Sequence, residues 1–379
     1  MSTVALVRCD SYDETAVSAA VRRGIQLLGG PEKFARKNEK ILLKVNLLAG
    51  DAPEKCTATH PAVFTAVAKV MMATGAIVSC GDSPSFGSTA AVAKKTGIAR
   101  AAEQLGVEIK DFSIGKEVAF PEGKQNKKFT IATPVLESDG IISLPKLKTH
   151  GFVKFTGAVK NQFGCIPGML KAEFHVKMTD PVSFARMLVD CNRLVHPRLY
   201  VMDGIMAMEG NGPRGGAPRK MNVLLFSEDP VAMDATACRL INLDPGLVPT
   251  ITLGRECGHG SCDEKEITLV GDDFALFKAA RFVVDRMPIR PFRAEGIARV
   301  VNNIFVPKPV IKKSKCVRCG HCVTICPVRP KAIDWCNNDR SRPPRHAYDR
   351  CIRCYCCQEV CPEKAITLRK PLLRLLFSF

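Results

Sequence analysis

The sequence is poor in aromatic residues, with a single tryptophan and an aromatic share of 6%. Proteins that bind single-stranded nucleic acids stack the bases on aromatic side chains, so this composition argues against such a role. The chain also has no run of about 18 apolar residues, the length that a membrane-spanning helix needs. Its first residues, Met1–Asp10, lack the basic stretch and long apolar segment of a secretory signal. We therefore expect a cytoplasmic protein with no transmembrane segment and no nucleic-acid partner.

Positive charge and cysteine are concentrated near the end of the chain. The sequence has 55 lysine and arginine residues against 37 aspartate and glutamate residues, a net charge of +18. Val306–Phe379 contains 16 basic and five acidic residues, which is more than half of that excess, and ten of the 18 cysteines. In a reducing compartment these thiols are better suited to be ligands or reactive groups than disulfides.

Two runs of cysteine have the spacing C-x2-C-x2-C-x3-C and are each followed by proline. They consist of Cys316, Cys319, Cys322 and Cys326, and of Cys351, Cys354, Cys357 and Cys361. This run is typical of bacterial ferredoxins, in which the fourth cysteine of each run binds the other cluster. The spacing therefore predicts two [4Fe-4S] clusters, one on Cys316, Cys319, Cys322 and Cys361, and one on Cys351, Cys354, Cys357 and Cys326. Paired zinc sites are the alternative.

This region resembles a two-cluster bacterial-type ferredoxin domain, with two departures. Cys356 is an extra thiol, which we expect to be a bystander, and the insertion Val328–Arg350 is rich in arginine and proline. Bound clusters would offset part of the local positive charge. The remaining charge favours an acidic electron-transfer protein, such as a ferredoxin or flavodoxin, as partner. We expect the apolar end Leu372–Phe379 to pack on the protein itself, and a weak membrane contact is the alternative.

The first 285 residues alternate between predicted strands and helices. Apolar runs such as Val4–Cys9 and Lys40–Asn46 favour strands, and amphipathic segments such as Glu14–Leu28 favour helices. Such alternation is typical of an α/β domain with a mainly parallel sheet. We therefore expect an α/β domain over residues 1–285, a linker over 286–311 and a small ferredoxin-like α+β iron–sulfur domain over 312–379.

The densest polar segment of the α/β domain is Ser143–Gly168. It follows a predicted strand, and open α/β sheets bind ligands at the carboxyl ends of their strands. A helix starting near Gly157 would point backbone N–H groups at an anion. The alternative is a solvated basic loop. The segment contains the polar residues Lys146, Lys148, Thr149, His150, Thr156, Lys160 and Asn161.

Other predicted strands also end in polar residues, which we expect to meet at one rim. Asp203–Gly216 is rich in glycine and is predicted to be a flexible loop at this site. We predict that a small anionic substrate is bound by Asn46, Asp82, Lys146, Thr149, Thr156, Asn161, Glu209, Asn211 and Arg214. We predict catalytic roles for His150, Lys148 and Lys160. The lysines would hold a carboxylate or phosphate, and His150 would donate a proton because its ordinary pKa suits transfer near neutrality.

Several of these segments together resemble a known family. They are "KVN", "GDSP", "LPKLKTH…TGAVKNQFGCIPG", "MDGIMAMEGNGPRGG" and "DPVAMDATA". They are similar to the domain-of-unknown-function family 362, whose members are often fused to such a ferredoxin. The resemblance covers nearly all of residues 1–285. It implies membership of this family but does not indicate a reaction.

The segment around Lys160 also resembles the nickel-pincer lactate racemases. The resemblance implies that Lys160 falls at the position of a lysine that holds a covalent nickel cofactor in those enzymes. The residues beside Lys160 depart from the racemase motif, and "KVNLLAG" replaces another of its motifs. Whether the first domain binds an additional metal or organic cofactor therefore stays an open question.

Four other cysteines and one histidine could also have a chemical role. Cys257, His259 and Cys262 could share a metal, although a glycine-rich turn is the interpretation that we favour. Cys80 and Cys165 flank the site motifs and could be nucleophiles or ligands. Free cysteines are, however, commonly buried as small apolar residues.

The sequence as a whole favours a ferredoxin-dependent reductase. This would be an anaerobic oxidoreductase that passes low-potential electrons through two clusters to an anionic substrate or cofactor in the first domain. Two other functions stay open. One is a non-enzymatic electron carrier or metallocentre assembly factor, and the other is a racemase-like proton-transfer enzyme.

Overall fold

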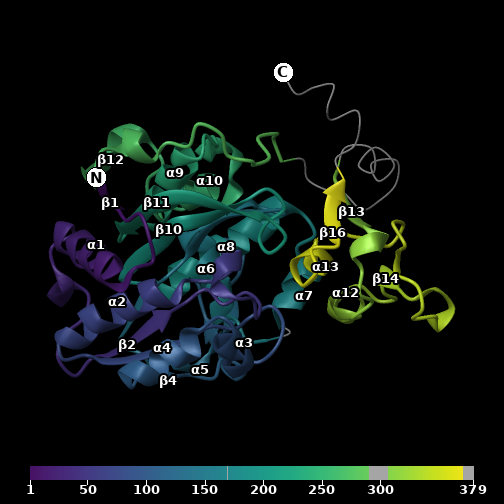
Figure 1. Ribbon diagram of the computed structural model, residues 1–379, viewed down its shortest axis with the longest axis horizontal. Helices are drawn as coiled ribbons and strands as arrows, with labels where there is room; N and C mark the ends of the chain where they lie inside the picture. The colour runs from purple at the N-terminus through teal and green to yellow at the C-terminus, as the bar shows by residue number, and fades with distance from the viewer. Residues whose placement is uncertain (169, 290–305, 370–379) are drawn as a thin grey trace.

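The computed structural model describes residues 1–168, 170–289 and 306–369, which form a large lobe and a small lobe (Figure 1). Most of the predicted linker 286–311 and the apolar end Leu372–Phe379 lie outside the described residues. Strand β13 (Lys308–Ile311) falls inside the predicted linker and pairs with β16 (Ile366–Arg369). The small lobe therefore includes residues that the sequence assigned to the linker.

A ten-stranded mixed sheet forms the centre of the large lobe. Its main path is β12-β1-β11-β10-β7-β2-β3-β4, and β8 pairs with both β10 and β9. Neighbouring strands are parallel except at three pairs, which are β1/β11, β10/β11 and β8/β9. The strands are β1 (Ser2–Arg8), β2 (Lys40–Lys44), β3 (Ile77–Gly81), β4 (Glu108–Ile109), β7 (Gly140–Ser143), β8 (Lys146–His150), β9 (Lys154–Thr156), β10 (Leu199–Glu209), β11 (Ala217–Ser227) and β12 (Ile267–Gly271).

Helices cover both faces of this sheet because its strands are apolar on both sides. In β2, Ile41 and Leu43 pack in one core and Leu42 packs in the other. The core around Ile41 also holds apolar residues of α1 (Glu14–Leu27), α2 (Pro61–Ala73), α3 (Thr89–Lys95) and α4 (Ile98–Leu105). The core around Leu42 holds those of α6 (Ala158–Asn161), α8 (Pro181–Val195), α9 (Pro230–Leu240) and α10 (Pro249–Glu256).

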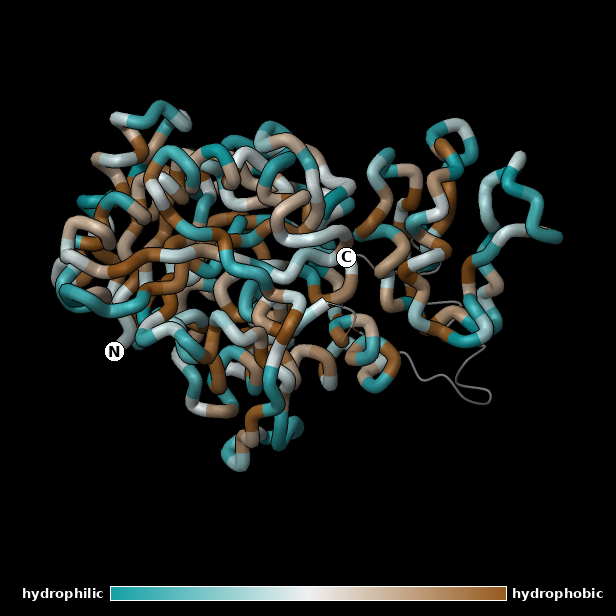
Figure 2. Tube along the Cα trace, turned by 90° about the horizontal axis from the view of Figure 1, so that it is seen from below, coloured by the Kyte–Doolittle hydropathy of each residue, from teal (hydrophilic) through white to brown (hydrophobic). Residues whose placement is uncertain are grey.

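This arrangement of layers confirms the predicted fold class, an α/β lobe with a mainly parallel sheet. Figure 2 shows hydrophobic stretches running through the middle of the large lobe and hydrophilic ones in its outer loops. A separate hairpin of β5 (Gly115–Ala119) and β6 (Lys128–Ala132) lies outside the main sheet, followed by the short helix α5 (Thr133–Leu136). Helix α7 (Leu170–Lys177) lies on the side of the large lobe that faces the small lobe (Figure 1).

The small lobe is a ferredoxin-like α+β unit, as the sequence predicted. It contains two antiparallel strand pairs, β13 with β16 and β14 (Ile333–Asp334) with β15 (Arg345–His346). Two short helices, α12 (His321–Ile325) and α13 (Cys356–Glu359), contact each other. In Figure 1, α13 lies between the large lobe and the rest of the small lobe.

The two-sided core of the sheet gives a direct test of the fold. Leu42 is fully buried in β2, whereas Ile77 at the start of β3 is 60% exposed. We expect Leu42→Ala to lower the free energy of unfolding by about 2–5 kcal/mol, because it removes buried methyl groups and leaves a cavity. Ile77→Ala should cost less than about 0.5 kcal/mol. Urea unfolding followed by circular dichroism measures both, and equal losses would contradict the assigned core.

Candidate functional site

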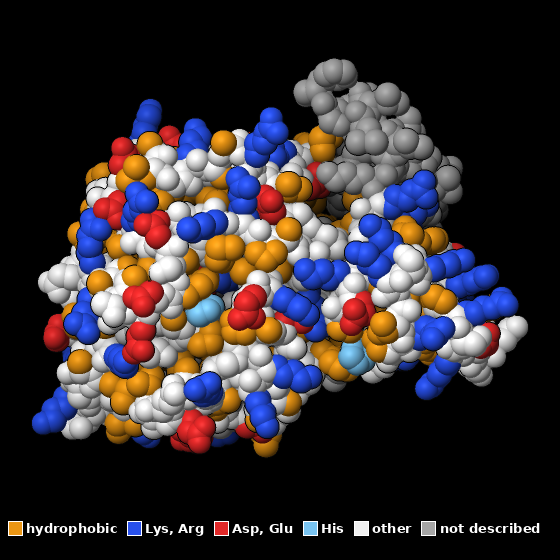
Figure 3. All heavy atoms as spheres, in the orientation of Figure 1, with side chains coloured by type: hydrophobic (Ala, Val, Ile, Leu, Met, Phe, Trp, Pro, Cys, Tyr) orange, Lys and Arg blue, Asp and Glu red, His pale blue; other side chains and the backbone are white. Residues whose placement is uncertain are grey.

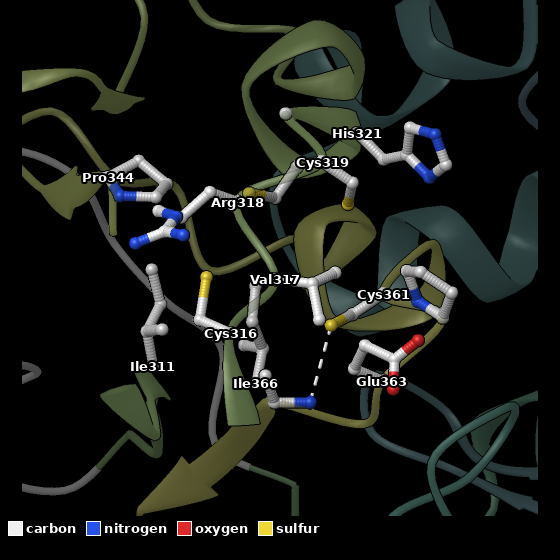
Figure 4. A pocket seen from close by; sticks show the side chains of 14 residues that line it. Ile311, Cys316, Val317, Arg318, Cys319, His321, Pro344, Cys361, Glu363 and Ile366 are labelled. Carbon is white, nitrogen blue, oxygen red and sulfur yellow. Dashed lines mark hydrogen bonds between the residues drawn. The ribbon is translucent and has the colours of Figure 1, made fainter. Parts of the chain in front are cut away.

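The ferredoxin-type cysteines of the small lobe surround two pockets. Each group takes three cysteines from one run and the fourth from the other run. One pocket is lined by Cys316, Cys319, Cys322 and Cys361, and the second by Cys326, Cys351, Cys354 and Cys357. Figure 4 shows the first pocket, in which the labelled side chains of Cys316, Cys319 and Cys361 lie around a common space.

The chain wraps around both pockets in the same way. Arg318 and Arg353 occupy equivalent positions in the two runs, and both have a left-handed backbone, with φ of 60° and 59°. Two residues further on, Gly320 and Tyr355 are also left-handed. A non-glycine residue rarely adopts this conformation, so its repetition shows that both loops meet the same geometric demand.

The fourth cysteine of each run accepts a backbone hydrogen bond. Ala365 N–H donates to Cys361 Sγ at 3.3 Å, drawn as a dashed line in Figure 4, and Ala332 N–H donates to Cys326 Sγ at 3.4 Å. Such bonds stabilise thiolate charge and tune the reduction potential of iron–sulfur clusters. In residues 1–168, 170–289 and 306–369, no three ligating side chains lie close enough together to hold a single metal ion.

A third cavity, of about 290 Å³, lies between the two lobes. Its large-lobe side comes from the loop after β3, from α6 and from α7, and its small-lobe side comes from α12 and α13. Its lining includes Phe86, Lys160, Phe163, Lys171, His175, Ile325, Cys356, Glu359 and Val360. Since α13 itself contains Cys357 and precedes Cys361, the cavity wall is adjacent in sequence to ligands of both thiol groups.

Charged and polar side chains from both lobes meet beside this cavity. His150 Nδ1 accepts hydrogen bonds from the N–H groups of Phe152 and Val153, so its proton in the neutral form is on Nε2. That nitrogen lies 3.0 Å from Glu359 Oε1. Burial, with the positive charge of Lys160 nearby, lowers the pKa of His150 to about 4. His150 is therefore neutral near pH 7 and directed at Glu359 of the small lobe.

The lysines at the strand ends lie in low-dielectric surroundings. Burial lowers the pKa of Lys148 to about 7, with Lys160 adding to the effect. Burial likewise lowers the pKa of Lys160 and brings that of Lys171 to about 7. Of the three residues predicted to be catalytic, Lys160 lines the cavity. Lys148 donates to Asn46 Oδ1 at 2.6 Å and to the carbonyl oxygen of Thr57 at 2.5 Å.

Three predicted binding residues form a network around Lys44, at the ends of β2 and β3. Lys44 Nζ lies 2.8 Å from Asp82 Oδ1 and donates to the carbonyl oxygen of Asn161 at 3.0 Å. Asn46 Nδ2 donates to Asn161 Oδ1 at 3.1 Å. Asn46, Asp82 and Asn161 thus lie together around Lys44. Their polar groups bind each other and Lys44, and none of the three lines the cavity.

Lys146 differs from its predicted role, because it pairs with a carboxylate of its own chain. Its Nζ lies 2.7 Å from Asp203 Oδ2 and 2.7 Å from the hydroxyl of Tyr12, which donates to Asp203 Oδ1. Lys146 is 1% exposed. Asp203 was predicted to end a strand, but it lies within β10. Because the charge of Lys146 is already compensated by Asp203, this lysine does not offer a net positive charge to a substrate anion.

The predicted anion site at the start of the helix near Gly157 is occupied by a carboxylate of the same chain, that of Asp234. Asp234 accepts hydrogen bonds from Ala158 N–H at 2.6 Å and from Val159 N–H at 3.1 Å. A Cβ on Gly157 would lie 2.0 Å from Asp234 Oδ1, so glycine is required for this approach. The prediction of a substrate anion here was wrong, because the motif "DPVAMDATA" supplies the carboxylate.

The loop after Asp203 was predicted to be a flexible substrate loop, but most of it is an ordered hairpin tip between β10 and β11. Arg214 makes two contacts with Asp51, at 2.7 and 3.0 Å, and donates to the carbonyl oxygen of Val360 at 2.5 Å. Asn211 donates to the carbonyl oxygen of Ile366 at 3.1 Å. Asn211 and Arg214 therefore dock the small lobe, which the sequence did not reveal.

The remaining predicted binding residues support this hairpin and β8. Thr149 Oγ1 donates to the carbonyl oxygen of Gly210, and Thr156 Oγ1 donates to that of Lys148. Glu209 accepts from Val283 N–H at 2.8 Å. Residues 210–215 also have the spacing G-x-G-x-x-G. They connect two antiparallel strands, whereas a dinucleotide-binding loop leads from a strand into a helix, so this context does not indicate a dinucleotide site.

Sequence reasoning missed three residues that line the cavity. Lys171 and His175 are four residues apart on α7 and so face the same side, but nothing in their spacing resembles a known motif. Glu359 lies between ferredoxin cysteines, where only the thiols carried a signal. Their common feature, a position at the contact between lobes, depends on tertiary structure.

The cysteines of the large lobe outside the ferredoxin-type runs that the sequence singled out are Cys80, Cys165, Cys257 and Cys262. Their surroundings favour a structural role. Cys80 and Cys165 are fully buried in the two apolar cores, and burial raises the pKa of each thiol to about 12, which disfavours a nucleophilic thiolate. His259 Nε2 donates to Asn192 Oδ1 at 2.5 Å. Cys257 and Cys262 pack against the large core. These contacts agree with a turn at Cys257–Cys262.

Comparison with known families identifies both parts of the chain. The model described as "Domain of unknown function (DUF362)" matches residues 41–239, which is more than half of the sequence. The chain belongs to the DUF362 family. A second model, the 4Fe-4S binding domain, matches residues 309–330 of this DUF362 protein. That range contains the first cysteine run, so the chain has a ferredoxin-type domain that binds at least one [4Fe-4S] cluster and serves electron transfer.

A curated relative of this DUF362 protein is the thylakoid-associated protein of Synechocystis sp. It is 35% identical over 259 residues, which cover 68% of this chain and 80% of the relative.

In the described part of the chain, no helix has the length and apolar character needed to cross a membrane.

Two solved structures also resemble this DUF362 protein, each at 12% identity over 62% of the chain. One is the lactate racemase apoprotein of Thermoanaerobacterium thermosaccharolyticum, with a TM-score of 0.42, of which 56% is covered. The other is a protein from Thermotoga maritima, with a TM-score of 0.38, of which 60% is covered. The matched region is thus somewhat more than half of either protein.

The contacts of Arg214 predict how the lobes are held together. We expect Arg214→Met to destabilise the docked state by up to about 3–5 kcal/mol, because it leaves the buried Asp51 with only the more distant Lys55, at 3.7 Å. Hydrogen–deuterium exchange of α13 should then speed up. The exposed Lys220 on β11 provides the control variant, Lys220→Met. Unchanged exchange in Arg214→Met would show that Arg214 is not needed to hold the small lobe.

Proposed function

We propose that this DUF362 protein is a cytoplasmic oxidoreductase that uses two [4Fe-4S] clusters to reduce a small anionic substrate bound between its lobes. The observation that carries this proposal is the position of the cavity. One side of it is formed by α12 and α13, which adjoin the cluster thiols, and the other side contains Lys160. A protein that only carried electrons would not need a cavity with a lysine at this place.

The second cluster is part of the proposal. The family match covers one cysteine run, and the structure repeats the geometry of that run in the other. Each run has two left-handed residues at the same positions, and each fourth cysteine accepts a backbone hydrogen bond. The ligands would be Cys316, Cys319, Cys322 and Cys361 for one cluster and Cys351, Cys354, Cys357 and Cys326 for the other. Such clusters, when bound, supply one-electron transfer at low potential.

Within the large lobe, Lys160 is the residue proposed to contact the substrate. His150 and Lys148 lie behind it and are proposed to act as positioning residues. His150 faces Glu359 across the lobe contact, and Lys148 fixes Asn46. The electrons for the reduction would come one at a time from a reduced partner protein, through the clusters.

The proposed partner is an acidic one-electron carrier, because the small lobe is strongly basic. Lysine and arginine side chains crowd the end of this lobe in Figure 3. Lys313, Lys315, Arg318 and the thiol ligand Cys319 are all exposed, and the apolar Val317 between them is 59% exposed. An apolar spot beside an exposed cluster ligand, surrounded by positive charge, suits a negatively charged donor.

Iron content tests the two-cluster proposal. Protein purified without oxygen should contain about eight irons per chain, and Cys319→Ser or Cys354→Ser should each lower this number by about four. Cys336 is exposed and lines neither thiol pocket, so Cys336→Ser is the control. Elemental analysis and the visible spectrum measure the result. Four irons in the wild-type protein would contradict the proposed second cluster. Zinc in place of iron would contradict both proposed clusters.

Charge reversal tests the partner. We expect Lys313→Glu combined with Lys315→Glu to slow reduction of the protein by an acidic ferredoxin by about tenfold or more at low ionic strength, because steering by opposite charges is lost. The same variant should be less sensitive to added salt. Lys220→Glu on the large lobe is the control. Stopped-flow measurement of cluster bleaching gives the rate, and equal rates for both variants would contradict docking at this surface.

A further inference from the structure

The charged residues around the cavity do not balance. Lys44 and Asp82 form a buried pair at 2.8 Å. Beside this pair, two amino groups, those of Lys160 and Lys171, and one carboxylate, that of Glu359, line the cavity. The lining thus has more basic than acidic groups. Burial without a counterion disfavours the charged form of a lysine, so such a site favours a ligand that supplies one negative charge.

The two cavity lysines differ in what they can offer a ligand. Lys171 Nζ is tied to Ser83, through both its hydroxyl and its carbonyl oxygen, and to the carbonyl oxygen of Ile166. These three contacts use all the donors of an ammonium group. Within the described residues Lys160 makes no hydrogen bond or ion pair, and its Nζ lies 5.8 Å from the ring centre of Phe163. Lys160 is therefore the cation available to a bound molecule.

A second polar group of the cavity also lacks a partner. His175 is 6% exposed, and its ring stacks on Phe184 with centroids 4.4 Å apart. Its Nδ1 is buried and makes no hydrogen bond in the part of the chain that the structure describes. The other ring nitrogen, Nε2, also makes no hydrogen bond to a described residue and is not enclosed as Nδ1 is, so it is the nitrogen that a ligand atom can contact. Lys160 and His175 both line this cavity.

The rest of the cavity surface is largely apolar. Phe86, Phe163, Ile325 and Val360 line it together with Pro84. Phosphate and other small dianions need more cationic and hydrogen-bonding groups than one free lysine and one histidine nitrogen. Apolar walls with a few convergent polar groups are typical of sites for small organic molecules.

We infer that the cavity between the lobes binds a small organic monocarboxylate, whose carboxylate contacts Lys160 and His175 and whose apolar body lies against Phe86, Phe163, Ile325 and Val360. This inference rests on the proposed function and names the substrate class of its site. Because Ile325 and Val360 belong to the small lobe, the binding site is complete only when both lobes are docked.

Titration calorimetry with the full-length, cluster-containing protein tests the inference. The probes are benzoate, its neutral isostere benzamide, and phenylphosphonate as a dianion. We expect benzoate to bind, benzamide to bind about tenfold more weakly or worse, and phenylphosphonate not to exceed benzoate. Lys160→Met should weaken benzoate binding by about tenfold or more, and Lys160→Arg should restore part of the affinity. Lys177→Met, at an exposed position of α7, is the matched control and should bind like the wild type.

Each other outcome has a defined meaning. Equal affinity for benzoate and benzamide, stronger binding of phenylphosphonate, or no effect of Lys160→Met would overturn the monocarboxylate inference. If no probe binds while the protein keeps its iron and its reducible visible spectrum, the inference is wrong and the proposed electron-transfer function stands. Loss of the iron signal from correctly folded wild-type protein would instead contradict the proposed function. His175→Leu provides a second variant, with a smaller expected loss of benzoate affinity, should Lys160→Met fail to fold.

Discussion

Arg214 connects the two lobes at a point where a buried charge has to be compensated. Its guanidinium satisfies Asp51 in the large lobe and the last-turn carbonyl oxygen of Val360 in the small lobe. Removing a partner from such a buried pair is costly, so this contact fixes the position of α13 against the sheet. Glu359 then faces His150, and Val360 completes the cavity wall. The geometry of the candidate site thus depends in part on an arginine that need not touch a substrate.

The glycine-rich segments of the large lobe serve close packing more than flexibility. A Cβ on Gly164 would lie 1.9 Å from Asp82 Oδ1, and one on Gly212 would lie 2.2 Å from the carbonyl oxygen of Thr149. Together with Gly157 beside Asp234, these positions let backbone approach buried carboxylates and carbonyl groups. Because these glycines have no side chain, buried polar and charged groups can find partners within the protein and do not need water.

Features with a local signal were accessible from the sequence, and features that depend on distant partners were not. The cysteine spacing and the alternation of strands and helices depend on neighbours in sequence, and they gave the fold class and a cluster. Lys146, Asn211 and Arg214 were assigned to a substrate because their partners Asp203, Ile366 and Val360 are close to them only in the folded chain. For the same reason His175 and Glu359 were overlooked, since a single residue on a short helix has no pattern of its own.

The shared cavity wall has a kinetic consequence. Because α12 and α13 belong to the same chain as Lys160, the proposed electron transfer from the iron–sulfur lobe to the cavity would be intramolecular and independent of protein concentration. Tethering gives the two parts an effective concentration on the order of millimolar, far above what two separate proteins reach in dilute solution. Only the arrival of the external electron donor then remains a diffusional encounter. Fusion of the two parts would thus make one of the two proposed electron-transfer steps intramolecular.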